Sequence, residues 1–571
     1  MAGPAWRKRQ KGSSEPAPVR APAHHRTPKQ SGAGIRTRLV MLGMAVLFAG
    51  IAGQLARLAG SGSDAIVASI TEQPGTRSYV RPDILDRGGR LLATDIEMPS
   101  LYADPSLVQS LDDTTERLGS VLHDLDQGEL RRLLSDRNRR FIWLRRGLSP
   151  RLAQQVHNLG LPGLEFRTEL RRAYPLERLA GHVLGSVNVD NKGASGIERT
   201  IDETIGVEPT LGAPTSAGLP VRLSLDLGVQ HALKDELEAA MARYDSKGAA
   251  GLVMDVRTGE MLASVSLPGV DPARPSELLD PNKTDKIQGG TYELGSVFKI
   301  LTVAMALDSG KAKPDTVLDV TKPLSAGRFT IKDLHSSGRP LTVSEVFLHS
   351  SNVGSGMLAL AEGADKQREF LDKLGLTRQL RTEAGPIAAP QVPARLGRAE
   401  QITIAYGHGI AVAPLQFAAA TAAIINGGTM VTPTYFRNRT NANGPGPRVI
   451  SEETSRSLSV LLRRNVAEKQ GTGTRADVPG FRVGGKTGTA EMPGRGGYQE
   501  KSVVSSFLAA FPMDAPKYLV FVLIFEPKGT DASAGEVLAG RNAAPTAGLV
   551  IGRIAPLLGV RPVHDVAQLD D

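Results

Sequence analysis

The segment YELGSVFKI, residues 292–300, runs directly into the apolar stretch LTVAMALDSG and carries a serine and a lysine three residues apart. Ser296 and Lys299 would lie on one side of the first turn of a helix, because residues three apart are neighbours on a helix surface. Taken alone, the pattern is common and fits a serine near a helix start and a lysine whose ammonium reaches water. Whether it carries chemistry depends on the rest of the chain.

The composition restricts the class of protein. A chain of 571 residues is too long for one compact domain and predicts about two to four units. The chain has no cysteine, which excludes disulfides, a cysteine nucleophile and thiolate metal sites. Its ten histidines show no metal-ligand spacing such as H-E-x-x-H. We therefore expect neither a metal nor a cofactor.

The formal net charge of +9 is concentrated at the N-terminus. Residues 1–38 contain nine lysines and arginines and one glutamate, in a segment without hydrophobic periodicity. This composition predicts a disordered basic tail. The remaining residues are nearly neutral as a whole, so a general nucleic-acid-binding surface is not expected.

An apolar segment follows the tail directly. Residues 39–56, LVMLGMAVLFAGIAGQLA, contain no charge and are long enough for a transmembrane helix, which we assign to residues 39–58. The positive charge before it predicts that the tail stays in the cytoplasm and that the rest of the chain lies across the membrane. A cleaved signal peptide fits less well, because the leader would be unusually long and no clear small-x-small cleavage site follows.

Beyond the anchor, a Gly- and Pro-rich interval at residues 210–220 marks a boundary between two regions. The first spans residues 65–215 and combines strand-like segments with a charged helical stretch at 115–136. The second spans residues 221–560 and is followed by a C-terminal tail, residues 561–571.

The second region mixes helices and strands without the alternation of a doubly wound sheet. An apolar stripe with a four-residue repeat predicts a helix and comprises Val229, Leu233, Leu237 and Met241. Strand-like runs flank a turn at 257–260, and two further runs are joined through residues 513–517, so both pairs are predicted to be hairpins. Strands at both ends with helices between them predict an α+β domain.

Three short motifs occur in order within this region. They are Ser296-x-x-Lys299, then Ser350-Ser351-Asn352, then Lys486-Thr487-Gly488 with Thr489 directly after it. The second begins 54 residues after the first, and the third 136 residues after the second. Each is weak alone, but S-x-x-K, S-x-N and K-T-G in this order are typical of penicillin-recognising serine acyl-enzymes.

The chemistry of a serine nucleophile explains why such residues would be combined. A serine hydroxyl is a poor nucleophile unless a base accepts its proton. A lysine ordinarily has a pKa of about 10.4 and would be a poor base at neutral pH. Burial and a neighbouring cation such as Lys486 would lower the pKa of Lys299 enough for it to accept the proton of Ser296. The helix start would also supply N–H groups where oxyanion charge develops.

One segment imitates a nucleotide-binding motif. GFRVGGKT, residues 480–487, matches the P-loop pattern G-x-x-x-x-G-K-[ST], which requires a strand before it and a helix after it. Pro479 interrupts the strand, and Gly488 and Pro493 oppose the helix. We therefore reject nucleotide binding.

Other charged and titratable residues are interpreted as structural. His349 and His408 suggest a Ser–His–Asp triad, but no G-x-S-x-G elbow is present to position its serine. Asp86, Arg87 and Glu198 are expected to hold the first region together rather than to catalyse a reaction.

From the anchor onward, the chain resembles the class B penicillin-binding proteins, most closely the FtsI-type septal peptidoglycan transpeptidases of Gram-negative cells. Residues 81–95, RPDILDRGGRLLATD, are similar to the first pedestal motif of the family but depart from it at Pro82-Asp83, where the family commonly has a glycine. Residues 171–202 are similar to the later pedestal motif. Residues 406–409 stand where division enzymes carry Y-G-x-G.

The resemblance implies an α+β fold. A transpeptidase domain, with a mainly antiparallel five-stranded sheet flanked by helices, would stand on an elongated pedestal of the dimerisation type. The transmembrane helix would anchor the protein in the inner membrane by a single pass, with the N-terminus cytoplasmic and the catalytic domain periplasmic. Implied partners are stem peptides, lipid-linked nascent glycan, β-lactams, an FtsW-type glycosyltransferase and other division-complex proteins.

The resemblance also implies roles for the motif residues. Ser296 would be acylated by the penultimate D-Ala of a stem peptide, with Lys299 as its base. Ser350 would relay a proton to the leaving amine, and Asn352 would orient Lys299 and hold a substrate amide. The residues implied to bind the substrate backbone and its carboxylate are Lys486, Thr487, Gly488 and Thr489. The backbone N–H groups of Ser296 and Thr489 would form the oxyanion hole.

Three alternatives stay open. A side-wall elongation transpeptidase would share the chemistry, but the Y-G-x-G segment and the lack of a long insertion favour the division enzyme. A β-lactamase is disfavoured because no E-x-x-L-N segment is present and the first region would be unexplained. A non-catalytic β-lactam sensor is disfavoured because the predicted cytoplasmic tail leaves no room for a signalling domain.

Overall fold

The structure is a computed structural model that describes residues 41–46, 48–52, 81–205, 219–326, 329–438, 446–494 and 497–563. The chain divides into two compact units, residues 1–76 and 77–571. The predicted tail at 1–38 and much of the predicted boundary at 210–220 lie outside the described residues, as do residues 564–571.

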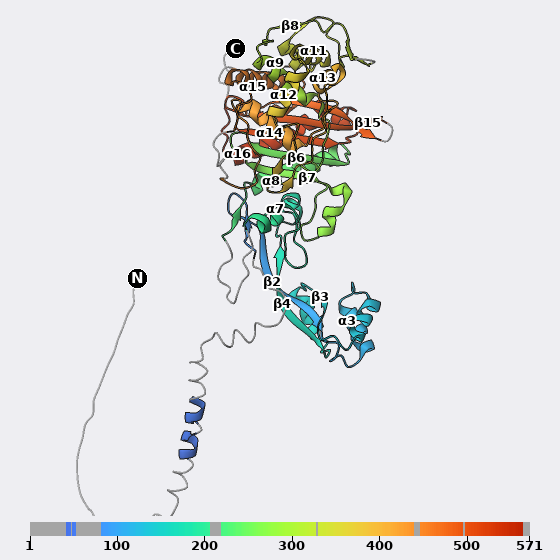
Figure 1. Cartoon of the computed structure of the whole chain (residues 1–571), viewed down its shortest axis with the longest axis vertical. Helices are drawn as coiled ribbons and strands as arrows, with labels where there is room; N and C mark the ends of the chain where they lie inside the picture. Colours follow the sequence, from blue (N-terminus) through green and yellow to red (C-terminus); the bar gives the residue numbers. More distant parts are fainter. Residues whose placement is uncertain are drawn as a thin grey trace, which may run out of the picture. The chain divides into compact units, whose positions relative to one another are not determined.

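The first unit is described only where the anchor was predicted. Residues 41–46 and 48–52 are helical (Figure 1). Their large apolar side chains are exposed. The rest of the predicted anchor at 39–58 lies outside the described residues. Within the described parts of the chain, none of the helices combines the length and the apolar composition that are needed to span a membrane.

The second unit contains a five-stranded antiparallel sheet in the order β14-β15-β16-β6-β7. Its strands are β6 (Gly248–Asp255), β7 (Met261–Leu267), β14 (Gly484–Gly494), β15 (Gly497–Phe511) and β16 (Tyr518–Phe525). The two predicted hairpins, β6–β7 and β15–β16, are confirmed. Every residue of β6, β7 and β16 is buried, so the continuous apolar run of β16 reflects a strand that is covered on both faces.

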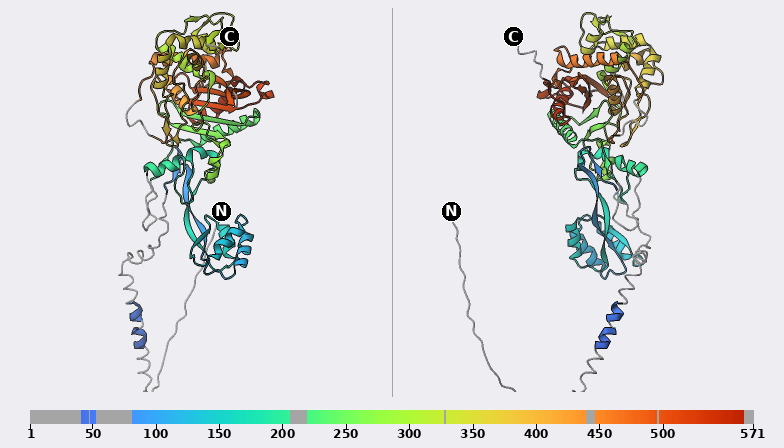
Figure 2. Two further views of the ribbon diagram at one scale, coloured as in Figure 1. Left: turned by 45° about the vertical axis from the view of Figure 1, so that its right-hand side comes forward. Right: turned by 90° about the vertical axis from the view of Figure 1, so that its left-hand side faces the viewer.

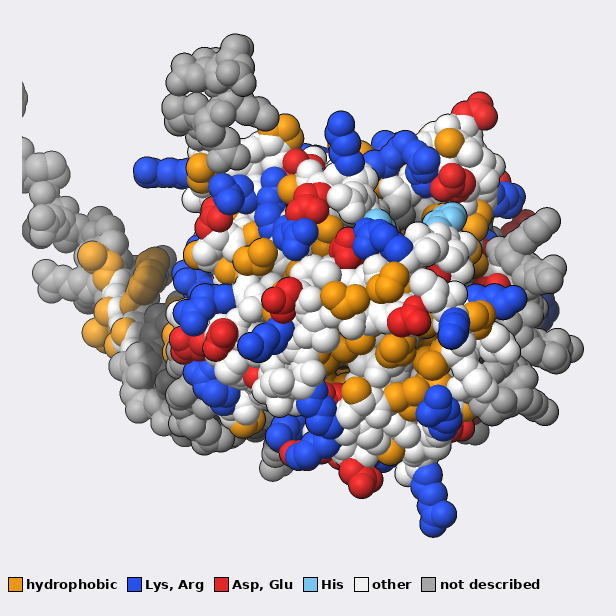
Figure 3. Space-filling model, turned by 90° about the horizontal axis from the view of Figure 1, so that it is seen from above, with side chains coloured by type: hydrophobic (Ala, Val, Ile, Leu, Met, Phe, Trp, Pro, Cys, Tyr) orange, Lys and Arg blue, Asp and Glu red, His pale blue; other side chains and the backbone are white. Residues whose placement is uncertain are grey.

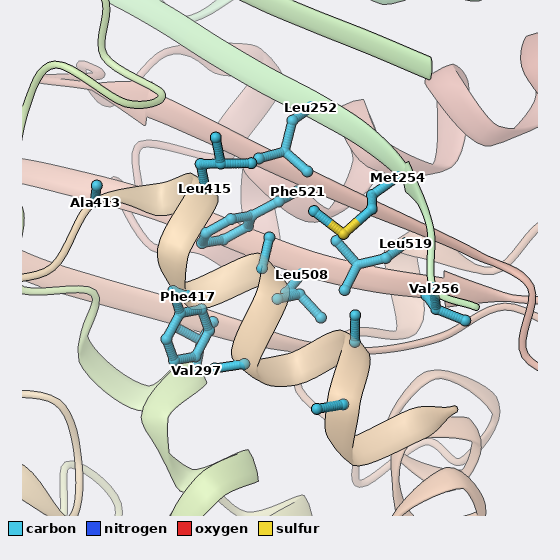
Figure 4. Close-up of a cluster of buried hydrophobic side chains, with 14 of the residues drawn as sticks. Leu252, Met254, Val256, Val297, Ala413, Leu415, Phe417, Leu508, Leu519 and Phe521 are labelled. Atoms are coloured by element: carbon cyan, nitrogen blue, oxygen red, sulfur yellow. The ribbon is translucent and has the colours of Figure 1, made fainter. Parts of the chain in front are cut away.

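Successive side chains of these strands enter two different apolar clusters, as a period of two requires. On one face, Leu252 and Phe521 pack against Leu415 and Phe417 of α14 (Pro414–Ile425), as Figure 4 shows. On the other face, the alternate residues pack against α8 (Leu227–Arg243) and α16 (Ala543–Leu557). The sheet is therefore the middle layer between helices (Figures 1 and 2).

The predicted helix with the four-residue repeat is α8. Its side chains Val229, Leu233 and Leu237 are fully buried, and Met241 is partly buried at the edge of the same cluster. Asp226 caps the helix by accepting hydrogen bonds from the N–H groups of Gly228 and Val229.

A helical layer is inserted between β7 and β14, and it carries two of the three motifs. Besides α14, the helices of this layer are α9 (Lys299–Asp308), α10 (Val343–Leu348), α11 (Asn352–Glu362), α12 (Ala364–Lys373), α13 (Arg398–Ile404) and α15 (Glu452–Ala467). Short strand pairs lie among them: β8 (Val317–Leu318) with β11 (Leu341–Thr342), β9 (Leu324–Ala326) with β10 (Phe329–Ile331), and β12 (Arg381–Thr382) with β13 (Gly385–Pro386).

Within the described residues 81–205, four strands form a second sheet, in which β2 pairs with each of the other three. Its strands are β1 (Ile84–Leu85), β2 (Leu91–Ala103), β3 (Ile142–Arg145) and β4 (Leu164–Ala173), and β5 (Val221–Arg222) pairs in parallel with β1. Helices α3 (Leu111–Val121), α4 (Gln127–Ser135) and α5 (Pro150–His157) cover one end, and the short helices α6 (Gly181–Leu184) and α7 (Gly196–Thr200) follow β4.

The charged stretch at 115–136 was expected to be one helical segment, but it is divided between two helices. α3 ends at Val121, and α4 starts after Asp126, whose side chain accepts a hydrogen bond from the N–H of Glu129. Asp126 is a favoured capping residue, and its cap defines a second helix start inside a stretch of uniform charge.

A buried ionic cluster holds this region together, as predicted for Glu198. The Glu198 carboxylate accepts hydrogen bonds from Arg81 at 2.9 Å and from Arg172 at 2.7 Å, and all three side chains are buried. Arg172 also reaches Asp95 at 3.2 Å. Asp86 is buried and accepts hydrogen bonds from Gly88, Arg90 and the N–H of Leu227, and Arg87 pairs with Glu260.

Replacing Glu198 by alanine should destabilise the protein strongly, because two buried guanidinium groups would lose their shared carboxylate. Removing one partner of a buried ion pair costs about 3–5 kcal/mol. Chemical denaturation, followed by circular dichroism, measures this loss. The control is Glu129→Ala, which removes an exposed pair with Arg132 and should change stability by less than about 1 kcal/mol. Equal effects of the two substitutions would contradict the role of the cluster.

Candidate active site

The serine and lysine of the first motif lie on two kinds of helix. Ser296 belongs to a 3₁₀ turn, η5 (Gly295–Phe298), and Lys299 is the first residue of α9. Side chains three apart are eclipsed in a 3₁₀ helix, which has three residues per turn. The S-x-x-K spacing therefore aligns the two side chains more closely than the expected α-helical turn would.

The backbone before Ser296 is tightly packed. Gly295 has φ +61°, and a Cβ atom there would lie 2.6 Å from the carbonyl oxygen of Thr489. Glycine adopts this conformation without strain and also permits the close approach. Because residue 295 has no side chain, the turn that carries Ser296 can lie directly against the K-T-G strand.

Lys299 connects the first two motifs. Its Nζ lies 3.0 Å from Ser296 Oγ, 3.0 Å from Ser350 Oγ and 2.7 Å from Asn352 Oδ1. It also donates to the backbone carbonyl of Ser350 at 2.5 Å. The Lys299 side chain is 0% exposed, so these groups replace water around its nitrogen.

The second motif is positioned by a turn and a helix start. Ser350 has φ +58°, an uncommon conformation for a residue other than glycine, and Asn352 begins α11. Ser351 caps α11 through the N–H of Gly354 and donates to Asp333 at 2.6 Å, and Asp333 also accepts from the N–H of Val353 at 2.9 Å. Sequence reasoning missed Asp333, because no local pattern connects it to a motif 18 residues away.

The third motif lies on β14, the edge strand of the sheet. Lys486 is 0% exposed, and its Nζ lies 3.0 Å from Ser350 Oγ, so this hydroxyl lies between the two lysines. A Cβ atom at Gly488 would lie 2.3 Å from the carbonyl oxygen of Leu294, which explains the small residue in the motif. The hydroxyl of Thr489 accepts from the N–H of Ala539 at 3.1 Å.

Two further residues support Thr487 and were also missed from the sequence. The hydroxyls of Thr487 and Thr472 are 2.7 Å apart, and Thr472 contacts the buried side chain of Asn465. Asn465 in turn donates to the carbonyl of Gly485 at 2.8 Å. The polar side chains behind the strand thereby fix its position.

The environment lowers the pKa of both lysines. Burial lowers the pKa of Lys486 to about 7. Burial, and then the neighbouring Lys486, hold the pKa of Lys299 well below its ordinary value, and Asp333 opposes this shift. Desolvation and a like charge both disfavour the ammonium form. Both effects favour the neutral amine of Lys299, which is the form that can accept a proton.

The positions of the residues in question agree with the rejection of a P-loop and of a Ser–His–Asp triad. Residues 484–487 lie within β14, which runs on as a strand, so no helix follows the P-loop-like segment. His408 is paired with Glu293, its Nδ1 lying 3.0 Å from Oε2, and His349 is exposed after α10. Among the residues that the structure describes, no group of three or more His, Asp or Glu side chains could hold a metal ion.

On the face seen from above, the described charged side chains are mixed in sign. Figure 3 shows Lys and Arg side chains interspersed with acidic and apolar ones. The described part of this face carries no continuous basic strip of the kind that tracks a phosphate backbone.

The geometry defines a class of enzyme. A serine hydroxyl contacts a buried lysine, a second serine lies between that lysine and another, and an edge strand of the sheet runs alongside. These are the parts of a serine acyl-enzyme whose general base is a lysine.

The comparisons with known proteins agree with this class. The penicillin-binding protein transpeptidase domain matches residues 249–543, and the penicillin-binding protein dimerisation domain matches residues 78–206. The probable peptidoglycan D,D-transpeptidase FtsI of Caulobacter vibrioides is 39% identical over 84% of this chain and 82% of its own length. The peptidoglycan D,D-transpeptidase FtsI of Escherichia coli is 29% identical over 85% of each chain.

A solved structure shares the fold of the catalytic part. The transpeptidase domain of Burkholderia pseudomallei penicillin-binding protein 3 matches with a TM-score of 0.53 and 30% identity, over 60% of this chain and 97% of that domain. The chain belongs to the class B penicillin-binding proteins, the family of the peptidoglycan transpeptidases.

The position of Asp333 predicts a change in the pH dependence of acylation. Asp333 raises the pKa of Lys299, so Asp333→Asn should lower that pKa further. Lys299 would then stay neutral to lower pH, and the acidic limb of the acylation rate should move to lower pH. The rate of acylation by a fluorescent penicillin, measured against pH, checks this shift.

The matched control is Asp319→Asn on the same connection, where the carboxylate contacts Thr321. This variant should leave the limb unchanged. A limb that moves to higher pH in Asp333→Asn would show that Asp333 does not act on Lys299 through its charge.

Proposed function

We propose that this protein is a peptidoglycan D,D-transpeptidase that cross-links stem peptides during septal wall synthesis, by a serine acyl-enzyme mechanism in which Lys299 is the base. The observation that carries the proposal is the buried nitrogen of Lys299, within hydrogen-bond reach of Ser296, Ser350 and Asn352. The names of the Caulobacter and Escherichia coli relatives support the reaction.

In the acylation step, Lys299 takes the proton of Ser296 Oγ as this oxygen attacks the carbonyl of the penultimate D-Ala. The oxyanion is received by the backbone N–H groups of Ser296 and Thr489. The close packing of Gly295 against Thr489 supports this assignment, since a Cβ at Gly295 would lie 3.3 Å from the Thr489 nitrogen. Donors fixed before the reaction stabilise developing charge without reorganisation.

The tetrahedral intermediate then expels the terminal D-Ala. Its nitrogen needs a proton, and Ser350 Oγ supplies it, because this hydroxyl contacts both lysines at 3.0 Å and can be reprotonated from either. An amine of a second stem peptide later attacks the acyl-enzyme and restores Ser296. The cross-link forms at this step.

The K-T-G strand holds the substrate. β14 is at the edge of the sheet, so an extended peptide can pair with its open side. The terminal carboxylate is bound by the hydroxyls of Thr487 and Thr489 and by the cation of Lys486, and Gly488 keeps the strand close to the turn of the nucleophile. β-Lactams acylate the same serine as substrate mimics.

The septal role and the location rest on other features. The septal role is supported by residues 406–409, the segment similar to Y-G-x-G, and by the division-type relatives. The exposed apolar side chains of the helical residues 41–46 and 48–52 support a single-pass anchor in the inner membrane, with residues 1–38 cytoplasmic and the catalytic part periplasmic. An FtsW-type glycosyltransferase and other division proteins would then be its partners, and lipid-linked nascent glycan would supply its substrate.

Substitution of the nucleophile or its base tests the reaction. Ser296→Ala should abolish labelling by a fluorescent penicillin, because no oxygen remains to be acylated. Lys299→Ala should reduce acylation by at least about 100-fold, the usual contribution of a general base, without unfolding the protein. Gel fluorescence measures labelling, and circular dichroism checks folding. Equal labelling of wild type and Ser296→Ala would disprove the mechanism.

The cellular role has its own test. A fluorescent fusion of the whole chain should gather at mid-cell before constriction, whereas an elongation enzyme would follow the side wall. Deleting residues 39–58 should release the protein from the membrane fraction. Rapid turnover of a chromogenic cephalosporin by the purified protein would instead favour a β-lactamase.

A further inference from the structure

The two threonine hydroxyls of the third motif have different hydrogen-bond partners behind the strand. The hydroxyl of Thr487 donates to Thr472 Oγ1 at 2.7 Å, whereas the hydroxyl of Thr489 accepts the N–H of Ala539 at 3.1 Å. A threonine hydroxyl has one hydrogen to donate and two lone pairs that accept. The direction of each contact therefore decides whether that hydrogen is left for a ligand.

The hydrogen of the Thr487 hydroxyl is used inside the protein. The hydroxyl and the N–H of Thr472 both donate to Asn465 Oδ1, at 3.3 and 3.1 Å, and Asn465 Nδ2 donates to the carbonyl of Gly485 at 2.8 Å. These contacts fix the amide of Asn465 in one orientation, with its oxygen at the end of a chain of hydroxyls. Thr487 must therefore break its bond with Thr472 before it can donate to a ligand.

The hydroxyl of Thr489 keeps its hydrogen. A backbone N–H can only donate, so Ala539 occupies a lone pair of this hydroxyl. Among the residues that the structure describes, no group accepts a hydrogen bond from it. Thr489 is partly exposed, and a Cβ atom at Gly295 would lie 3.3 Å from its nitrogen, so this residue is next to the turn of the nucleophile.

A buried serine on the neighbouring strand holds the contact between Ala539 and Thr489 in place. Ser505 of β15 is directly opposite Thr489, so the two side chains share a face of the sheet, and Ser505 is 0% exposed. Its hydroxyl donates to the carbonyl of Val537 at 2.6 Å. Asn542, before the start of α16, donates to the same carbonyl at 3.1 Å. The chain is thus fastened two residues before the N–H that meets Thr489.

A carboxylate can use such a hydroxyl directly. An ionised carboxylate only accepts hydrogen bonds, so its receptor must present donors. Hydrogen bonds to an ionised group are stronger than those between neutral groups. A hydroxyl that already accepts a bond from behind can point its hydrogen at the carboxylate without losing another partner. Thr489 meets this condition, whereas Thr487 does not.

We propose that Ser505 is a positioning residue which, through Val537 and Ala539, makes Thr489 the main hydroxyl donor to the terminal carboxylate of the acyl donor. The recognised group is an ionised carboxylate, on an extended peptide or on a β-lactam, and a neutral ester in its place loses this contact. The proposal rests on the transpeptidase function given above. It ranks the two threonines of the carboxylate site and adds a residue outside the three motifs that controls one of them.

The test compares two penicillins that differ in charge. The whole protein and its variants are acylated by benzylpenicillin, which has a free carboxylate, or by its methyl ester, which cannot ionise at that position. Mass spectrometry of the intact protein measures the acylation rate with each compound. The ratio of the two rates reports recognition of the carboxylate, because a general loss of structure or of the nucleophile would lower both rates together.

We expect Ser505→Ala to lower the acylation rate with benzylpenicillin by at least about tenfold, the usual effect of losing a hydrogen bond to a charged group. The rate with the methyl ester should stay within about twofold of wild type. Thr489→Val should cause the same selective loss, and Thr487→Val a smaller one. Adding Ser505→Ala to Thr489→Val should not change the ratio further, because the serine acts through that threonine.

The matched control is Ser224→Ala. Ser224 is also 0% exposed, and its hydroxyl donates to the carbonyl of Met261 at 2.7 Å. Met261 belongs to β7, at the opposite edge of the sheet from β14, so this variant should leave the ratio unchanged. Thermal unfolding, followed by circular dichroism, shows which variants are folded. If Ser505→Ala does not fold, the comparison of Thr489→Val with Thr487→Val decides whether Thr489 is the donor.

Three results would overturn the proposal while leaving the transpeptidase function in place. An unchanged ratio in Ser505→Ala would show that the serine only supports the fold. A greater loss in Thr487→Val than in Thr489→Val would make Thr487 the main donor. Additive losses in the double variant would show that Ser505 does not act through Thr489. A wild-type protein that neither penicillin acylates would instead contradict the transpeptidase function, and the proposal with it.

Discussion

The removal of one lysine nitrogen from water is the constraint on which the catalytic part of this structure depends. An ammonium in an apolar interior is costly, so a buried lysine is either paired with an anion or neutral. Here the groups around Lys299 are two hydroxyls, a carbonyl and an amide oxygen, and a second lysine lies close by. The arrangement therefore favours the neutral amine. Three distant segments must meet to create it.

The fold brings these three segments together through close contacts between their backbones. The sheet buries both of its faces, so its edge strand β14 has a fixed place beside the 3₁₀ turn of Ser296. Close-packed interiors deform little, which keeps catalytic distances constant. The pairing of Glu293 with His408 extends the same packing to partly exposed side chains next to this turn.

The sequence was sufficient to predict the motifs, both hairpins, the helix α8 and the family, because each depends on local patterns of residues. It was not sufficient for Asp333, Thr472 and Asn465, whose roles depend on contacts between distant segments. The 3₁₀ turn at Ser296 was also missed, since S-x-x-K fits either kind of helix. The division of residues 115–136 into two helices depends on a single cap at Asp126.

The strand β5 has a consequence for the order in which the molecule can be completed. Val221 and Arg222 pair with β1, and the amide of Leu227 binds the carboxylate of Asp86. These partners are more than a hundred residues apart in the sequence, and β1 is synthesised before β5. Until β5 has been made, the edge of β1 that pairs with it has no hydrogen-bonding partner. A fragment that stops near residue 205 would never close that edge. The first region and the catalytic region are therefore coupled during biosynthesis, before any catalysis can begin.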